Sequence, residues 1–154
     1  MEHAQFYEEL YGKLVALIGN ERDWVANLAN AAALLWEELP RINWVGFYIL
    51  KGEELVLGPF QGRPACIRIG MGKGVCGQTA LLRKSHVVPD VHEFPGHIAC
   101  DPISRSEVVV PIEKDGQLLG VLDVDSPELA RFSEADGAGL EKVANFLAER
   151  CDWA

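Results

Sequence analysis

The strongest constraint on the fold is a change of pattern at Pro40. Before it, apolar residues recur at helical spacing; from Ile42 onward they form short runs of branched and aromatic residues, separated by glycine-containing turns. A helical pattern closes the chain. Because helices do not alternate with every strand, a parallel sheet is disfavoured. The order of elements predicts an α+β domain, in which N- and C-terminal helices pack on an antiparallel sheet.

Three longer helices are expected. The first has the apolar stripe Phe6, Leu10, Leu14 and Leu17. The second spans residues 24–39, with Asn20 as a cap, Asp23 in the first turn and the stripe Leu28, Ala32, Leu35 and Trp36. The third spans residues 135–150, with Ser133 and Asp136 in capping positions and the stripe Leu140, Val143, Ala144 and Leu147.

The central part of the chain predicts two hairpins and several shorter elements. The expected strands are 44–50, 54–57, 67–69, 86–89, 107–112 and 117–125, with a short helix over 74–84 and a long loop over 91–104. The whole chain, 1–154, is expected to be one domain, since 154 residues can enclose a hydrophobic core.

Charge and composition narrow the class of protein. A net charge of -9 disfavours nucleic-acid binding, which relies on basic surface. No apolar stretch reaches the roughly 20 residues that a membrane span needs, and the N-terminus lacks the pattern of a signal peptide. We therefore expect a cytoplasmic protein, in which four cysteines favour catalytic or redox roles over structural disulfides.

The loop over 91–104 holds the first candidate thiol. Cys100 lies near His92 and His97 and beside Asp101. An imidazolium would favour the nucleophilic thiolate, whereas Asp101 would oppose it. The alternative is a cysteine that simply packs in a lid. The number of titratable neighbours favours a functional role for Cys100 over simple packing.

Two further cysteines lie earlier in the chain. Cys66 precedes a predicted strand, and Cys76 follows a glycine-rich turn in the first turn of a predicted helix, where a thiolate would be stabilised. The glycines match a dinucleotide fingerprint in letters, but no convincing βαβ unit surrounds them, so we expect them to serve a tight turn. The spacing of the cysteines, with His86, His92 and His97, is too scattered to indicate zinc. Cys151 is expected to be a bystander.

A cluster of acids is predicted at the end of the second hairpin. Asp123 and Asp125 share a face of an otherwise apolar strand. A three-residue turn would pair Glu107 with Asp123 on that face, and a two-residue turn would point Glu107 away. Clustered acids with little water should leave at least one protonated near neutrality. The alternative is a surface ion pair of Glu107 with Arg105.

An aromatic slot is the third feature. Trp44, Gly46 and Tyr48 share one face of a strand, and the glycine leaves a gap between two rings. Such a slot suits a cation or a sulfur group. Core packing is the alternative.

Over essentially its whole length the sequence resembles the free methionine-(R)-sulfoxide reductases, enzymes made of a single GAF domain. The matching motifs are 43–48, 58–62, 65–66, 72–77, 88–91, 97–101, 104–107 and 122–126. This resemblance implies a GAF-like fold and reduction of free methionine-(R)-sulfoxide. A non-catalytic GAF ligand sensor is the competing expectation.

The resemblance also implies roles for the cysteines. Cys100 would attack the sulfoxide and become a sulfenic acid, Cys66 would resolve it as a disulfide, and Cys76 would be an auxiliary. Thioredoxin would restore the thiols. No metal or organic cofactor is expected. The resemblance also implies that the protein forms a homodimer.

For the substrate pocket, the resemblance implies that Glu107 and Asp125 polarise the sulfoxide oxygen and that Asp123 helps to hold the ammonium. Trp44 and Tyr48 would enclose the methyl-sulfinyl end. Backbone amides between residues 66 and 76 would receive the carboxylate.

Overall fold

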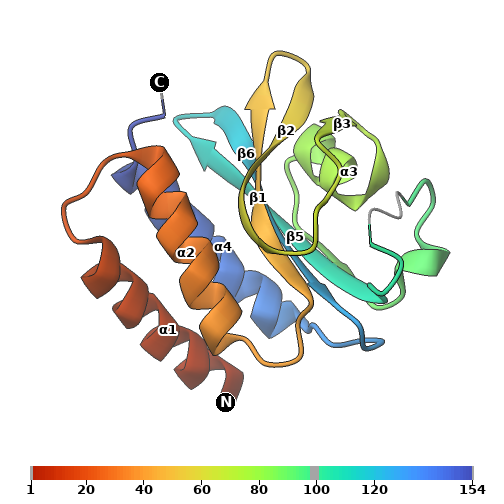
Figure 1. Ribbon diagram of the computed structural model, residues 1–154, viewed down its shortest axis with the longest axis horizontal. Coiled ribbons are helices and arrows are strands. Elements are labelled where there is room, and N and C mark those ends of the chain that lie inside the picture. The colour runs from red at the N-terminus through yellow and green to blue at the C-terminus, as the bar shows by residue number, and fades with distance from the viewer. Residues whose placement is uncertain (1, 98–100, 154) are drawn as a thin grey trace.

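A six-stranded antiparallel sheet organises the protein, which is described here as a computed structural model of residues 2–97 and 101–153 (Figure 1). Its strand order is β3-β2-β1-β6-β5-β4. The strands are β1 Trp44–Lys51, β2 Glu54–Gly62, β3 Arg68–Gly70, β4 His86–Val88, β5 Ser106–Lys114 and β6 Gln117–Ser126. The helices are α1 Glu2–Ile18, α2 Trp24–Glu38, α3 Gly74–Leu82 and α4 Glu134–Arg150, with a 3₁₀ turn at Val91–Glu93. The predicted fold class is confirmed.

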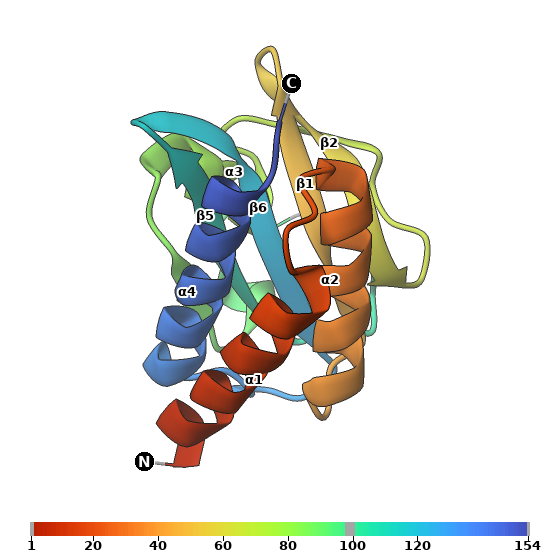
Figure 2. The same ribbon diagram turned by 90° about the vertical axis from the view of Figure 1, so that its left-hand side faces the viewer.

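The helices divide between the two faces of the sheet. Helices α2 and α4 pack on one face and α1 rests on both of them, as Figure 2 shows from the helical side. Helix α3 packs on the opposite face, against β3, β5 and β6. A large apolar core fills the space under α1, α2 and α4, and a second apolar cluster lies under α3. No helix within the described residues is both long and apolar enough to cross a bilayer.

Three details of the N-terminal helices differ from the prediction. Leu17 is 48% exposed, and Ile18 is buried in its place, because the i+4 step from Leu14 stays closer to the buried side of α1. Trp36 is 41% exposed, because the buried side of α2 follows Ala31 and Leu35 and continues to Leu39. Asp23, not Asn20, caps α2, since its carboxylate accepts a hydrogen bond from the Ala26 amide. By contrast, Ser133 and Asp136 form the predicted capping box of α4.

The β5–β6 hairpin reaches the predicted arrangement by a different route. The turn has two residues, Asp115 and Gly116, both with positive φ, so the three-residue turn was wrong. A β-bulge follows: Glu113 pairs with Leu118 and Ile112 with Gly120, which leaves Leu119 as the extra residue. The bulge shifts the register by one residue.

The shifted register decides which way the acids face. Glu107 lies opposite Asp125 rather than Asp123, and Val109 lies opposite Asp123. Since side chains alternate along a strand, Glu107, Asp123 and Asp125 all project from the same face. The predicted shared face is therefore confirmed, with a different cross-strand partner.

Candidate active site

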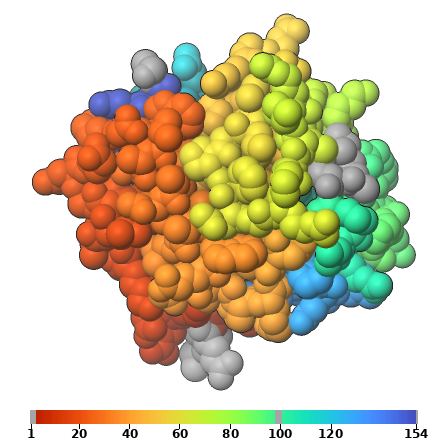
Figure 3. Space-filling view, viewed as in Figure 1, coloured from red at the N-terminus to blue at the C-terminus, as the bar shows by residue number. Residues whose placement is uncertain are grey.

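A cavity opens on the face of the sheet that carries α3. Its empty space, including the part open to solvent, is about 560 Å³. It is lined by Trp44, Tyr48, Pro64, Ala65, Ile69, Lys73, Gly74, Val75, Cys76, His97, Asp101, Ser104, Glu107, Asp123 and Asp125. In the space-filling view of Figure 3, the chain between β2 and β3 (yellow-green) forms the surface over the middle of the molecule.

The floor of the cavity carries three carboxyl groups. Glu107 is 7% exposed and Asp123 is 5% exposed, while Asp125 is partly accessible. Burial raises the pKa of all three well above the ordinary values, and their mutual repulsion raises it further. This supports the expectation that at least one carboxyl group keeps its proton near neutrality.

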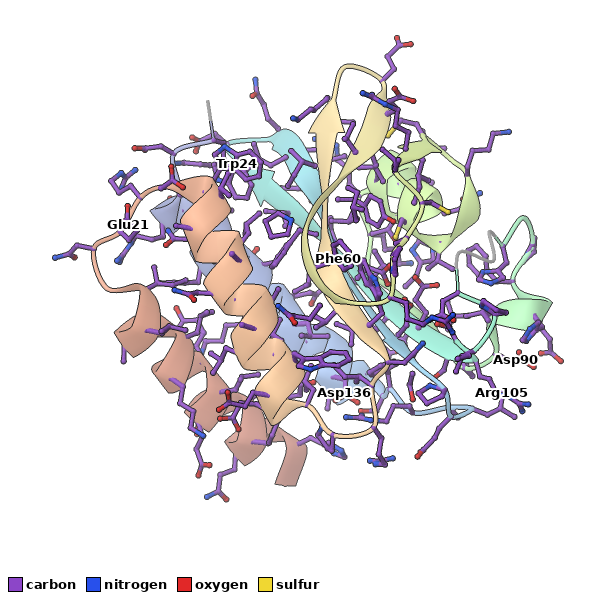
Figure 4. All side chains as sticks on the ribbon, viewed as in Figure 1. Glu21, Trp24, Phe60, Asp90, Arg105 and Asp136 are labelled. Carbon is purple, nitrogen blue, oxygen red and sulfur yellow. The ribbon has the colours of Figure 1, made fainter. Side chains whose placement is uncertain are left out.

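The alternative of a Glu107–Arg105 surface ion pair is wrong. Glu107 is buried, whereas Arg105 is exposed and lies at the periphery near Asp90 (Figure 4). Arg105 belongs to the loop before β5, which begins at Ser106, so the alternation of side chains along the strand does not fix the direction of Arg105.

Cys76 lies in the first turn of α3, as predicted, but not as a thiolate. Its Sγ donates a hydrogen bond to Asp123 Oδ2 at 3.3 Å. Burial raises the pKa of the Cys76 thiol well above its ordinary value, and Asp123, Glu107 and Asp125 raise it further. The nearby negative charges outweigh the favourable end of the helix, so the expected thiolate is corrected to a neutral thiol.

The glycines before α3 hold Cys76 in this position. Gly74 has a φ of +61°, a backbone conformation that glycine adopts without strain. A Cβ on Gly77 would lie 2.5 Å from the carbonyl oxygen of Gly70. The Gly72 amide donates to the Gly77 carbonyl at 2.8 Å. These glycines form a compact turn into a helix, as expected.

The aromatic pair lines the cavity, but the slot above Gly46 is not open. A Cβ on Gly46 would lie 2.3 Å from the Cβ of Phe60, so Phe60 and the Trp44 indole fill that space. Phe60 stacks on Trp44 with centroids 5.3 Å apart, and Figure 4 labels it near the centre of the molecule. The prediction of a gap between two rings was wrong because β2 supplies a third ring.

The polar ends of the two rings hold the loop before Cys66. Trp44 Nε1 donates to the Arg63 carbonyl at 3.1 Å, and the Tyr48 hydroxyl donates to the Cys66 carbonyl at 2.8 Å. Cys66 itself is partly buried and packs on the apolar cluster beneath α3. The two aromatic residues therefore position one candidate redox cysteine as well as lining the cavity.

The other two candidate cysteines, Cys100 and Cys151, do not lie among the described residues of the cavity. Cys100 lies outside the described residues, although its neighbours in the sequence His97 and Asp101 line the cavity. Cys151 is buried in the core beneath α1, α2 and α4, on the other side of the sheet, as expected for a bystander.

One contributing residue was not singled out from the sequence. The side-chain amide of Asn43 donates to Asp101 Oδ2 at 3.1 Å and to Ser104 Oγ at 3.0 Å, and both acceptors belong to the cavity wall. Asn43 directly precedes β1, so only the fold brings it to the loop more than fifty residues later.

Comparison with known proteins gives the family of the chain. The GAF domain family model matches residues 23–150. The Escherichia coli free methionine-R-sulfoxide reductase is 47% identical over 143 residues, 93% of this chain and 87% of that protein. The Saccharomyces cerevisiae enzyme of the same name is 43% identical over 155 residues, 96% of this chain and 86% of that protein.

A solved structure is similarly close. The X-ray structure of free methionine-R-sulfoxide reductase from Neisseria meningitidis, in complex with its substrate, has a TM-score of 0.92 and 48% identity over 96% of this chain and 89% of that one. Fold and site thus define a GAF-domain oxidoreductase. Within that class, the chain belongs to the free methionine-R-sulfoxide reductase family.

Proposed function

We propose that this protein reduces free L-methionine-(R)-S-oxide to L-methionine, with Cys100 as the nucleophile. The observation that carries the proposal is the convergence of three carboxyl groups, two of them on buried residues, and two aromatic rings in one small cavity. Three related proteins bear the name of this activity, and one of them was solved with its substrate.

The carboxyl groups supply the proton that the reaction needs. As the S–O bond of the sulfoxide breaks, its oxygen must gain a proton, and a carboxylic acid with a raised pKa can donate one near neutral pH. We assign this role to Glu107 and Asp125, which are cross-strand partners. Asp123 then holds the substrate ammonium, and its hydrogen bond from Cys76 fixes its orientation.

The other end of the amino acid fits the opposite wall. Trp44 and Tyr48 line the cavity with apolar ring surface suited to a methyl-sulfinyl group. Gly74 and Val75 belong to the cavity lining at the start of α3, where free amides attract a carboxylate. Binding both charged ends would favour a free amino acid over a residue within a protein.

The thiol chemistry proceeds in two steps. The Cys100 sulfur attacks the sulfoxide sulfur, takes over the oxygen as sulfenic acid and releases methionine. The Cys66 thiol then displaces water from the sulfenic acid and forms a disulfide. An external dithiol, which we expect to be thioredoxin, supplies two electrons and two protons to restore both thiols. Neither step needs a metal or an organic cofactor.

Assembly and location extend the proposal. We expect the enzyme to work as a homodimer in the cytoplasm, where a thioredoxin system keeps thiols reduced. Sedimentation of the purified protein tests the first expectation, since a monomer at assay concentration would contradict it. Fractionation of cells tests the second.

The decisive test of the function separates the two sulfoxide epimers. Reduced protein with a dithiol should consume free L-methionine-(R)-S-oxide and spare the S epimer. Cys100→Ser should abolish methionine release, whereas Cys66→Ser should still release about one methionine per chain in a single turnover. The absence of turnover with the R epimer by reduced, folded protein would overturn the proposal.

A further inference from the structure

We propose that the floor of the cavity is also a binding site for a thiophilic divalent cation such as Zn²⁺ or Cd²⁺, held by Cys76, Glu107 and Asp123. One ligand atom from each residue lies within 4.8 Å of the others, and all three residues are buried. Within residues 2–97 and 101–153, no histidine joins this group. The set therefore differs from a zinc site made of scattered cysteines and histidines.

A buried carboxylate oxygen at this place lacks an ordinary hydrogen-bond donor. Asp123 Oδ2 accepts the hydrogen bond from Cys76, but no amide, hydroxyl or thiol among the described residues donates to the buried Asp123 Oδ1. The other side-chain partners of Asp123 are the carboxyl groups of Glu107 and Asp125. Asp123 is 5% exposed and lines the cavity. A buried carboxylate oxygen needs a proton, a hydrogen-bond donor or a cation. A metal ion between Asp123 and Glu107 meets that need.

The donor set selects the kind of metal. Zinc binds cysteine sulfur and carboxylate oxygen, and open zinc sites have three protein ligands and a free position for water. Mg²⁺ prefers all-oxygen octahedral sites and disfavours a thiol. On binding, Cys76 loses its proton to solvent, and any proton on the two carboxyl groups leaves as well. The ion then replaces repulsion between the three groups with attraction to a shared charge.

The cation and the substrate would compete for one place. The metal would occupy the space between the carboxyl groups of Asp123 and Glu107, where the substrate ammonium and sulfoxide oxygen are expected to bind. This competition rests on the proposed function, whereas metal binding itself does not. A thiophilic cation would thus act as an inhibitor, and its release would be required for turnover.

The test uses a protein from which the two redox cysteines have been removed. In Cys66→Ser/Cys100→Ser protein, Cys76 and Cys151 are the remaining thiols. With a phosphine as reductant, titration with Cd²⁺ should produce the ultraviolet charge-transfer band of a cadmium–thiolate bond, saturating at one ion per chain. Adding Cys76→Ser should remove the band, and adding Cys151→Ser should leave it unchanged. Adding Asp123→Asn should weaken binding by at least about 10-fold.

Each outcome decides the matter. A band that survives Cys76→Ser, or no band in protein with unchanged circular dichroism, overturns the metal site. A band that follows Cys76 supports it. Free methionine-(R)-S-oxide should then raise the apparent Kd for Cd²⁺ in the same protein. A band that the sulfoxide leaves unaffected supports the metal site but contradicts the proposed placement of the substrate.

Discussion

Glu107 is the direct cross-strand partner of Asp125, and this pairing depends on the bulge that leaves Leu119 unpaired. Without the bulge, the two-residue turn at Asp115 and Gly116 would place Glu107 opposite Val124 and turn it toward the helices. The fold thus places acidic side chains next to one another at the cavity, although their mutual repulsion is destabilising. Such a concentration of like charge is typical of a site selected for chemistry rather than for stability.

The first prediction concerns stability against pH. Because the pKa of Glu107 is raised in the folded state, the folded protein binds more protons than the unfolded chain above the unfolded pKa of about 4.3. The free energy of unfolding should therefore fall as pH rises from about 5 toward the folded pKa. Glu107→Gln removes this contribution, so the stability of the variant relative to the parent should increase as pH rises from about 5 toward 8.

Denaturant unfolding at several pH values between 5 and 8 measures the effect, as the difference between variant and parent. Glu53→Gln is the matched control, since Glu53 is exposed in the turn between β1 and β2. An equal gain in both variants would mean that lower net charge, rather than the buried site, is responsible. A relative stability of Glu107→Gln that falls as pH rises would contradict the prediction.

The second prediction separates two roles of Cys76. Its hydrogen bond holds the pKa of Asp123 below the value that burial and Asp125 would otherwise impose. Cys76→Ser keeps a donor and should retain activity within a few-fold. Cys76→Ala removes the donor and should lower kcat/KM by about 10-fold, in line with the loss of a hydrogen bond to a charged group. In Cys76→Ala, the part of the pH profile of kcat/KM that reports the titration of Asp123 should also move to higher pH.

Steady-state assays from pH 5 to 9 with a dithiol reductant compare the two variants. If Cys76→Ser is as impaired as Cys76→Ala, then the thiol acts through its redox chemistry, and the positioning role fails. Cys151→Ala serves as the control, because Cys151 lies in the core on the other side of the sheet.

Much of this arrangement could be read from the sequence. The order of elements follows from hydrophobic period and glycine-containing turns, and the box of Ser133 and Asp136 is a local motif that works without tertiary help. The acids stood out because two of them interrupt an apolar strand. These are short-range signals, which the chain carries within a few residues.

The errors share a different origin. Next to the bulge at Leu119, a Cβ on Gly120 would lie 2.2 Å from the Tyr48 carbonyl oxygen, on a strand about seventy residues away. Phe60 fills the expected slot because β2 folds back along β1. The neutral state of Cys76 depends on carboxyl groups from β5 and β6. Each outcome is decided by a contact between distant segments, and local pattern does not encode it.

The third prediction compares two glycines. Gly77→Ala would place a methyl group 2.5 Å from the Gly70 carbonyl, so α3 must shift and carry Cys76 with it. We expect a loss of about 1–3 kcal/mol in unfolding free energy, as in other overpacked sites, and a marked loss of activity. Gly12→Ala, in the exposed part of α1 with no atom within 4 Å, should instead gain about 0.5–1 kcal/mol and keep full activity. Thermal unfolding of the pair, alongside the epimer assay, tests both; equal stability changes would contradict the crowding argument.

The last prediction concerns the loop that carries Cys66. The pKa of Tyr48 is raised by burial and by Asp123, so its phenol keeps its proton and remains a donor to the Cys66 carbonyl. Tyr48→Phe keeps the ring on the cavity wall but removes that hydrogen bond. Release of the first methionine should stay within a few-fold of the parent, while formation of the disulfide should slow by up to about 10-fold, the equivalent of one hydrogen bond.

Rapid-quench single-turnover experiments follow both steps, with methionine measured as the product and thiol loss as the sign of the disulfide. Tyr11→Phe is the control, because Tyr11 lies on α1, where its ring contacts Phe146 and Lys142 on the helical side of the sheet. If Tyr48→Phe slowed the first step and spared the second, the hydroxyl would act on the substrate. Its contact with the Cys66 carbonyl would then not be what sets the rate at which Cys66 resolves the sulfenic acid.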